Sequence, residues 1–299
     1  MRLVLAPLVL LALAPVQATE VDIPVPELPL PEHPRPDFQR ADWVNLNGPW
    51  SFRFDAEGVG EGEGWATAAP TDYPLTIQVP FPWGAPLSGI ADEADVGWYA
   101  RTVRIPRDWV GRRVFLCVGA SDWRTTAWLD GQPLGTHQGG YTPFDLELTD
   151  HVKPGEGQTL VVRVDDSPHP FKLEGKQGYG PARGLWQTVY LEARPAAFIE
   201  AFELRPDLSG EKVAVRVHLA EPAGSGTSAA LELGVGEEAS AHQAAVVPQG
   251  ERTVRFEVPV PRPRLWSLED PHLYHGSVLL RTPESEDRVR TYFGMREIS

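Results

Sequence analysis

Cysteine is almost absent from this sequence of 299 residues. Cys117 is the only one, so no disulfide can form within a chain, and hydrophobic cores must hold the fold. It lies in the apolar run RRVFLCVGA, where no neighbour in sequence would lower the pKa of its thiol. We therefore expect a buried, unreactive thiol on a strand.

Clustered basic residues are missing as well. The sequence has 27 Lys and Arg against 41 Asp and Glu, which gives a formal net charge of -14. A surface that binds nucleic acid or an anionic membrane needs clustered positive charge. We therefore expect no nucleic-acid partner and no membrane partner for the processed chain, whereas a neutral ligand such as a sugar is compatible.

Only one long apolar run is present, and it lies at the N-terminus. Arg2 precedes the apolar residues 3–16, and residues 16–18 offer a small-residue cleavage site. About 20 apolar residues are needed to span a membrane, and this run is shorter. We interpret residues 1–18 as a cleavable signal peptide and expect an exported protein, periplasmic or extracellular.

Apolar residues at helical spacing are absent beyond this leader, whereas the sequence holds 30 Pro and 28 Gly. Residues 19–36 are rich in proline and predict an extended linker that is not packed. Beyond the linker, short alternating runs such as Trp50, Phe52 and Phe54 indicate half-buried strands. Asp130-Gly131 between two such runs predicts a tight hairpin.

The strands fall into two groups. In the second group, Val213, Val215 and Val217 predict one buried face, and the stretch DRVRTYFGMREIS near the C-terminus alternates in the same way. We predict an all-β protein: a jelly-roll-like antiparallel β-sandwich over residues 37–195, followed by an immunoglobulin-like β-sandwich over residues 196–299.

Motifs for a cofactor, a metal or a nucleophile are missing. His272 and His275 are the only close pair of histidines, and on a strand they would point to opposite faces. No Gly-x-Ser-x-Gly elbow occurs, and no glycine-rich loop opens a helix. We predict neither a cofactor nor a metal.

Carboxylates are abundant, and Asp165-Asp166 is the pair of most interest. It follows the strand-like run LVVRV, where adjacent carboxylates can bind a cation, cap the loop or accept hydrogen bonds from sugar hydroxyls. Ten Trp are present, and indole rings can stack on sugars, although most should anchor the cores.

Several stretches resemble one known family, glycoside hydrolase family 2. Its N-terminal sugar-binding domain is similar to VPFPWGAPLSGI, VGWYARTVRIP, DWRTTAWLDGQPLGTHQGGYTPFDLELTD, LVVRVDD and GLWQTVYLE. Its next module, an immunoglobulin-like sandwich, is similar to PRLWSLEDPHLY and YFGMREIS. The resemblance spans residues 37–299.

The resemblance implies that this chain is part of a β-glycosidase whose catalytic residues lie in a further domain. In this family the Phe-Gly-x-Arg strand leads into a (β/α)₈ barrel that carries the catalytic Glu pair, with an Asn before the acid/base Glu. Asn45 and Asn47 are the only asparagines here, and neither precedes a Glu. The barrel's βα pattern is also absent, so we expect no catalytic residue in this chain.

The family's motifs suggest residues for the edge of a sugar pocket. Pro82 stands where some β-galactosidases carry a substrate-contacting Asn, beside a tryptophan. For Trp128 and Trp186 we expect structural roles. The expected substrate-binding residues are Trp83, Asp165, Asp166, Lys176, Gln177 and Arg183.

Three functions stay open. The chain is the accessory portion of an exported family 2 β-glycosidase, a stand-alone carbohydrate-binding module, or a protein that docks on a separately encoded barrel. The expected partners are carbohydrate and a catalytic barrel in cis or in trans. Self-association into a homo-oligomer also stays open.

These assignments predict that the 299-residue chain alone hydrolyses no aryl glycoside, because no carboxylate pair is positioned for it. Nitrophenol release from the purified chain should stay at the buffer background. Turnover that Asp166→Ala abolishes would contradict the prediction.

Overall fold

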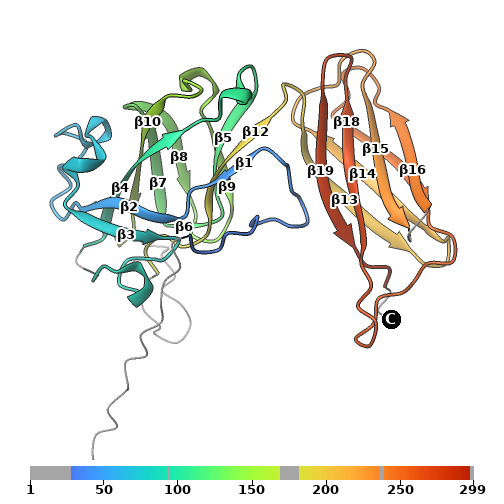
Figure 1. Ribbon diagram of the computed structural model, residues 1–299, viewed down its shortest axis with the longest axis horizontal. Coiled ribbons are helices and arrows are strands. Elements are labelled where there is room, and N and C mark those ends of the chain that lie inside the picture. Colours follow the sequence, from blue (N-terminus) through green and yellow to red (C-terminus); the bar gives the residue numbers. More distant parts are fainter. Residues whose placement is uncertain (1–27, 93, 169–181, 236–238, 297–299) are drawn as a thin grey trace, which may run out of the picture.

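The computed structural model of the chain describes residues 28–92, 94–168, 182–235 and 239–296. Within these ranges the chain forms two antiparallel β-sandwiches in succession (Figure 1). The predicted all-β architecture is confirmed. The helices of the described part are single 3₁₀ turns, and none is long and apolar enough to cross a membrane.

The first sandwich packs a six-stranded sheet against a four-stranded sheet. The six-stranded sheet has the order β3 (Leu75–Val79), β2 (Gly48–Phe54), β4 (Val96–Arg104), β10 (Gly157–Asp165), β7 (Arg124–Leu129), β8 (Gln132–Gln138). The four-stranded sheet has the order β1 (Trp43–Asn45), β12 (Val189–Arg194), β5 (Arg113–Val118), β9 (Phe144–Glu147). A short ladder pairs β11 (Gly184–Leu185) with β6 (Ser121–Asp122).

Local sequence explains the hairpin and the core of this sandwich. Asp130 and Gly131 both have positive φ angles, 49° and 77°, so the two-residue turn joins β7 to β8 as predicted. The alternating residues of β2 place Trp50 and Phe52 in the core between the sheets. Cys117 is 1% exposed, and burial raises the pKa of its thiol well above its usual value, as expected of an inert cysteine.

The second sandwich has a three-stranded and a four-stranded sheet. The first has the order β13 (Ile199–Asp207), β14 (Lys212–Leu219), β17 (Thr253–Pro259). The second has the order β16 (Ala239–Val246), β15 (Ser228–Val235), β18 (Tyr274–Arg281), β19 (Glu286–Phe293). Every second residue of β14 and β19 is buried, which confirms the alternation read from the sequence.

Residues 28–42, which we name the N-terminal strap, lie between the two sandwiches (Figure 1). We predicted that residues 19–36 are not packed, and for the described residues 28–36 this is wrong. Pro29 and His33 are buried, and the carbonyl of Pro29 accepts a hydrogen bond from Asn47. Proline excludes a helix or an inner strand, but it does not prevent an extended segment from packing on a sheet.

Arg40 of the strap connects the two sandwiches at their interface. Its guanidinium binds both carboxylate oxygens of Asp287 on β19, at 2.9 and 2.8 Å, and the carboxylate of Glu192 on β12, at 2.9 Å. It also donates to the carbonyl oxygen of Ile199 at 2.7 Å. Arg40, Glu192 and Asp287 are each at most 3% exposed, so these three charges are buried together. Each has its counter-charge within hydrogen-bond distance.

A β-bridge and a short strand hold the strap on either side of Arg40. Gln39 exchanges two backbone hydrogen bonds with Arg290 of β19, at 3.0 and 2.8 Å. Four residues after Gln39 the chain enters β1, which pairs with β12 of the first sandwich. The strap is therefore fixed to both sandwiches within a few residues.

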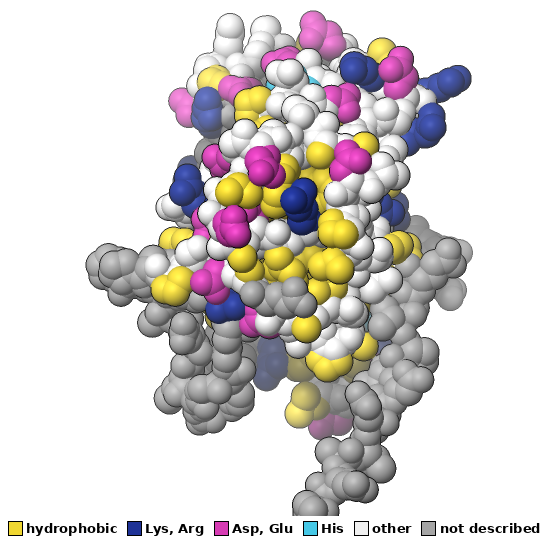
Figure 2. Space-filling model, turned by 90° about the vertical axis from the view of Figure 1, so that its left-hand side faces the viewer, with side chains coloured by type: hydrophobic (Ala, Val, Ile, Leu, Met, Phe, Trp, Pro, Cys, Tyr) yellow, Lys and Arg dark blue, Asp and Glu magenta, His cyan; other side chains and the backbone are white. Residues whose placement is uncertain are grey.

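Figure 2 shows the end of the molecule formed by the first sandwich, on the side away from the second. Apolar side chains gather near the middle of this face, and acidic and basic side chains lie around them. Under the loop that follows β2, Trp65 and Trp98 are buried against the outer face of the six-stranded sheet. This sheet therefore has an apolar cluster on each face.

We predict that Arg40→Met lowers the free energy of unfolding by about 3–5 kcal/mol, because it leaves the buried Asp287 without its cation and removes one of the two guanidinium groups that bind Glu192. The matched control is Arg35→Met in the same strap. Arg35 pairs with Asp37 at the surface, and losing an exposed pair costs about 0–1 kcal/mol. Urea denaturation of both variants measures the difference, and equal losses would show that Arg40 is not the main electrostatic link.

Candidate functional site

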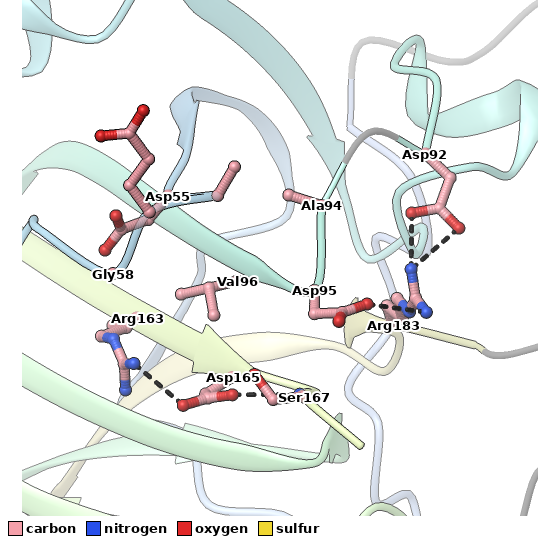
Figure 3. A pocket seen from close by; sticks show the side chains of 12 residues that line it. Asp55, Gly58, Asp92, Ala94, Asp95, Val96, Arg163, Asp165, Ser167 and Arg183 are labelled. Atoms are coloured by element: carbon pink, nitrogen blue, oxygen red, sulfur yellow. Dashed lines mark hydrogen bonds and ion pairs between the residues drawn. The ribbon is translucent and has the colours of Figure 1, made fainter.

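A polar pocket of about 630 Å³ opens where β10 ends (Figure 3). Its walls come from the loop after β2, the segment 92–96 before and into β4, the end of β10, and Arg183 just before β11. Five carboxylates and two guanidinium groups line it, so the lining is acidic. The charged lining residues are Asp55, Glu57, Asp92, Asp95, Asp165, Arg163 and Arg183.

Arg183 organises one side of the pocket by binding three carboxylates. Its Nη1 lies 2.9 Å from Asp92, its Nη2 lies 2.8 Å from Asp95, and its Nε lies 3.1 Å from Asp166. In Figure 3 the side chains of Asp92 and Asp95 point toward Arg183 from the segment before β4. One cation thus connects that segment to β11 and to the end of β10.

Gly184 places Arg183 at this position. Its φ is +90°, a conformation that residues with side chains rarely adopt. A Cβ atom at Gly184 would lie 2.6 Å from the ring of Trp83, so only glycine fits against this core indole. Because Gly184 packs so closely, its neighbour Arg183 is held at the mouth of the pocket.

On the other side of the pocket, Asp165 accepts hydrogen bonds from Arg163 Nη2 at 2.9 Å and from the Ser167 backbone N–H at 3.0 Å. Partial burial alone would raise the pKa of Asp165, but the hydrogen bonds from Ser167 and the charge of Arg163 hold it below its usual value. Asp165 is therefore ionised at neutral pH. It can accept hydrogen bonds but cannot act as a proton donor there.

Asp55 also lines the pocket and is only 4% exposed. Its carboxylate accepts hydrogen bonds from the backbone N–H groups of Val59 and Gly60 and from the indole of Trp98, at 2.8, 3.0 and 3.0 Å. These bonds satisfy the carboxylate within the protein. Asp55 therefore shapes the loop after β2 and is not free to bind a ligand.

The structure brings some of the predicted site residues together. Asp165 and Arg183 line the pocket. Asp166 is completely buried and joins the pocket wall through Arg183, and its backbone N–H donates to the carbonyl oxygen of Asp95. Trp83 is 2% exposed and packs against the rings of Phe52, Phe54 and Tyr99, so the structure places it in the core and not in the pocket lining.

Two predicted residues, Lys176 and Gln177, lie outside the described residues. The two tryptophans that we expected to be structural are both held by the protein. Trp128 stacks on Trp98 at 5.3 Å, and the indole N–H of Trp186 donates to the carbonyl oxygen of Gly140 at 2.8 Å.

Sequence reasoning missed Asp92, Asp95 and Arg163. The run ADEAD immediately before the strand of β4 was the available signal for the first two, because an acidic segment at a strand start lies at a sheet end. No local pattern marks Arg163, which occupies an ordinary outward position of β10.

The pocket is suited to binding hydroxyl groups. Three of its carboxylates, Asp92, Asp95 and Asp165, can accept hydrogen bonds, its guanidinium groups can donate them, and ion pairs hold both in place. Among the described residues no group of three or more His, Cys, Asp or Glu side chains could hold a metal ion.

Comparison with known families assigns both sandwiches. The family profile described as "Glycosyl hydrolases family 2, sugar binding domain" matches residues 43–195, and "Glycosyl hydrolases family 2" matches residues 197–296. The chain belongs to glycosyl hydrolase family 2, which confirms the resemblance seen in the sequence.

Individual relatives are distant, and their chains are longer. A β-glucuronidase of Paenibacillus borealis is 24% identical over 85% of this chain and 45% of its own length. A β-galactosidase of Oenococcus oeni is 23% identical over 81% of this chain and 26% of its own. The crystal structure of a Ruminococcus gnavus β-glucuronidase shares the fold with a TM-score of 0.71 at 20% identity, covering 88% of this chain and 47% of that one. The chain thus spans less than half of each relative.

We predict that Arg183→Met lowers the free energy of unfolding by about 1–3 kcal/mol at pH 7. The reason is that Asp92, Asp95 and Asp166 lose the cation that they share.

Urea denaturation at pH 7 measures the destabilisation by Arg183→Met. The matched control is Arg205→Met, which removes an exposed arginine paired with Glu203 on the surface of the second sandwich. A deficit for Arg183→Met no larger than that of the control would contradict the assigned role of Arg183.

Proposed function

We propose that this chain is the sugar-binding and immunoglobulin-like portion of a longer, exported β-glycosidase of family 2. The catalytic (β/α)₈ barrel would lie in the remainder of that protein. The observation that carries the proposal is the partial coverage of its relatives: this chain corresponds to 45% of the Paenibacillus β-glucuronidase and 47% of the Ruminococcus enzyme. The substrate would be a β-glycoside.

The chemistry of the polar pocket supports an accessory role. A retaining glycosidase needs a protonated acid and a free nucleophilic carboxylate about 5–5.5 Å apart. Here Asp92 and Asp95 are bound by Arg183, Asp55 is saturated by three donors, and Asp165 is held ionised by Arg163 and Ser167. Asp92, Asp95 and Asp165 are suited to hydrogen bonding with sugar hydroxyls at the edge of a site.

The same pocket also favours a second candidate, a secreted carbohydrate-binding protein without catalytic activity. Such a protein would use the polar pocket alone, or it would dock on a separately encoded barrel. The size of the native protein separates this candidate from the first.

An antibody raised against residues 43–195 would purify the protein from the periplasm and the medium of its native host. We expect an intact mass well above the 33.0 kDa of this chain, and hydrolysis of a p-nitrophenyl β-glycoside by the same species. A second antibody, against residues 197–296, is the control and must detect the same species. An intact mass of 33.0 kDa or less would contradict the proposal and favour the binding protein.

A further inference from the structure

A second cleft lies between the two sandwiches, apart from the polar pocket, and we name it the interdomain cleft. Tyr190, Glu192 and Arg194 of β12 line it, together with the strap, the start of β9 and residues 198–200. Its volume is about 320 Å³. Small-molecule sites occur preferentially at domain interfaces and have volumes of about 300–1,000 Å³, so this cleft suits a ligand of one small ring.

Tyr190 is a mostly buried polar group of this cleft whose hydroxyl has no partner among the described residues. It is 8% exposed, and the edges of His33 and Trp43 pack around its ring at centroid distances of 5.5 and 6.1 Å. Its hydroxyl makes no hydrogen bond to any residue within the described ranges, although the ring is fixed. Burial raises the pKa of the phenol, so the hydroxyl keeps its proton and can donate to a ligand.

The charges of the cleft balance one another. Three guanidinium groups and three carboxylates line it, and the buried ones are already paired. Glu192 lies 2.9 Å from Arg40 and 2.7 Å from Arg194, and Arg194 lies 2.6 Å from Asp145. An anionic ligand would find each of the three guanidinium groups already paired with a carboxylate and would lose its hydration, so the lining favours a neutral ligand over an anionic one.

The remaining surface of the cleft is aromatic. Phe38 stacks on Phe202 at 5.1 Å, and Phe144 stacks on His137 at 4.1 Å. Both phenylalanines are only half-buried, so each presents apolar surface to the cleft. Apolar ring surface beside carboxylates and a hydroxyl donor matches a molecule that carries both C–H faces and hydroxyl groups.

We propose that the interdomain cleft binds one neutral sugar unit, with the Tyr190 hydroxyl donating to it and the carboxylate oxygens of Glu192 and Asp145 accepting from its hydroxyls. This site is additional to the polar pocket and does not depend on the proposed glycosidase function. Since both sandwiches and the strap form the cleft, a bound sugar stabilises their docked arrangement.

Titration of the 299-residue chain with methyl β-D-glucoside, methyl β-D-galactoside and methyl β-D-mannoside, followed by ligand-observed NMR and calorimetry, tests the proposal. At least one of these glycosides should bind, and methyl β-D-glucuronide should bind more weakly than that glycoside. Tyr190→Phe keeps the packing and removes one hydrogen bond, so it should weaken binding about fivefold.

Tyr141→Phe is the matched control, because it removes the same hydroxyl from a ring that is 70% exposed and lies outside the cleft. It should leave the affinity unchanged. A second variant, Ala220→Leu, adds bulk to the cleft wall and should also weaken binding. Thermal unfolding of each variant confirms that it folds.

Three results would overturn the proposal. The first is that none of the three neutral glycosides binds. The second is that neither Tyr190→Phe nor Ala220→Leu changes the affinity, and the third is that the glucuronide binds as tightly as the neutral glycoside or more tightly. If Asp95→Asn abolished sugar binding while the Tyr190→Phe variant bound the sugar as tightly as the wild type, the sugar would lie in the polar pocket instead. None of these results bears on the mass of the native protein, which tests the proposed function separately.

Discussion

The buried ion pairs of Arg40 fix the arrangement of this protein. Asp287 belongs to the second sandwich and Glu192 to the first, and one guanidinium binds both. Burying these three charges is costly unless each is paired, so separating the sandwiches would expose or orphan them. The strap, the β-bridge to β19 and the short strand β1 all place this one side chain. The interdomain cleft exists because this contact holds its walls together.

A comparable ion-pair network organises the polar pocket. Arg183 holds Asp92, Asp95 and Asp166, which come from the segment before β4 and from the end of β10. This arrangement gives the pocket a fixed set of hydrogen-bond acceptors, because Asp92, Asp95 and Asp166 are all bound by one cation. In the proposed function, this pocket would contribute shape and hydrogen bonds, and the barrel would contribute the chemistry.

The sequence predicted the features that depend on near neighbours. The alternation in β14 and β19 and the Asp130-Gly131 hairpin follow from backbone geometry over a few residues, and all are present. The packing of the strap was missed because its contacts are distant in sequence: Arg40 and Asp287 are 247 residues apart. No periodicity within the strap indicates such a partner.

The candidate site could be predicted only in part, because some of its residues are also brought together by contacts that are distant in sequence. Asp165 and Arg183 were identified through motifs of the family, and both line the pocket. Asp92 and Asp95 reach it only because β4 pairs with β10, which a local pattern does not reveal. Trp83 was expected at the pocket edge, but its indole is in the core, where Gly184 packs against it.

The distance between the sandwiches tests the central claim most directly. Spin labels at Val110→Cys and Val246→Cys would report it, since these residues are 71% and 76% exposed and lie on different sandwiches. Cys117 is 1% exposed and would stay unlabelled. Pulsed electron–electron double resonance should give one narrow distance distribution in the otherwise wild-type chain and a broad one when Arg40→Met is added. A broad distribution in the otherwise wild-type chain would contradict the account.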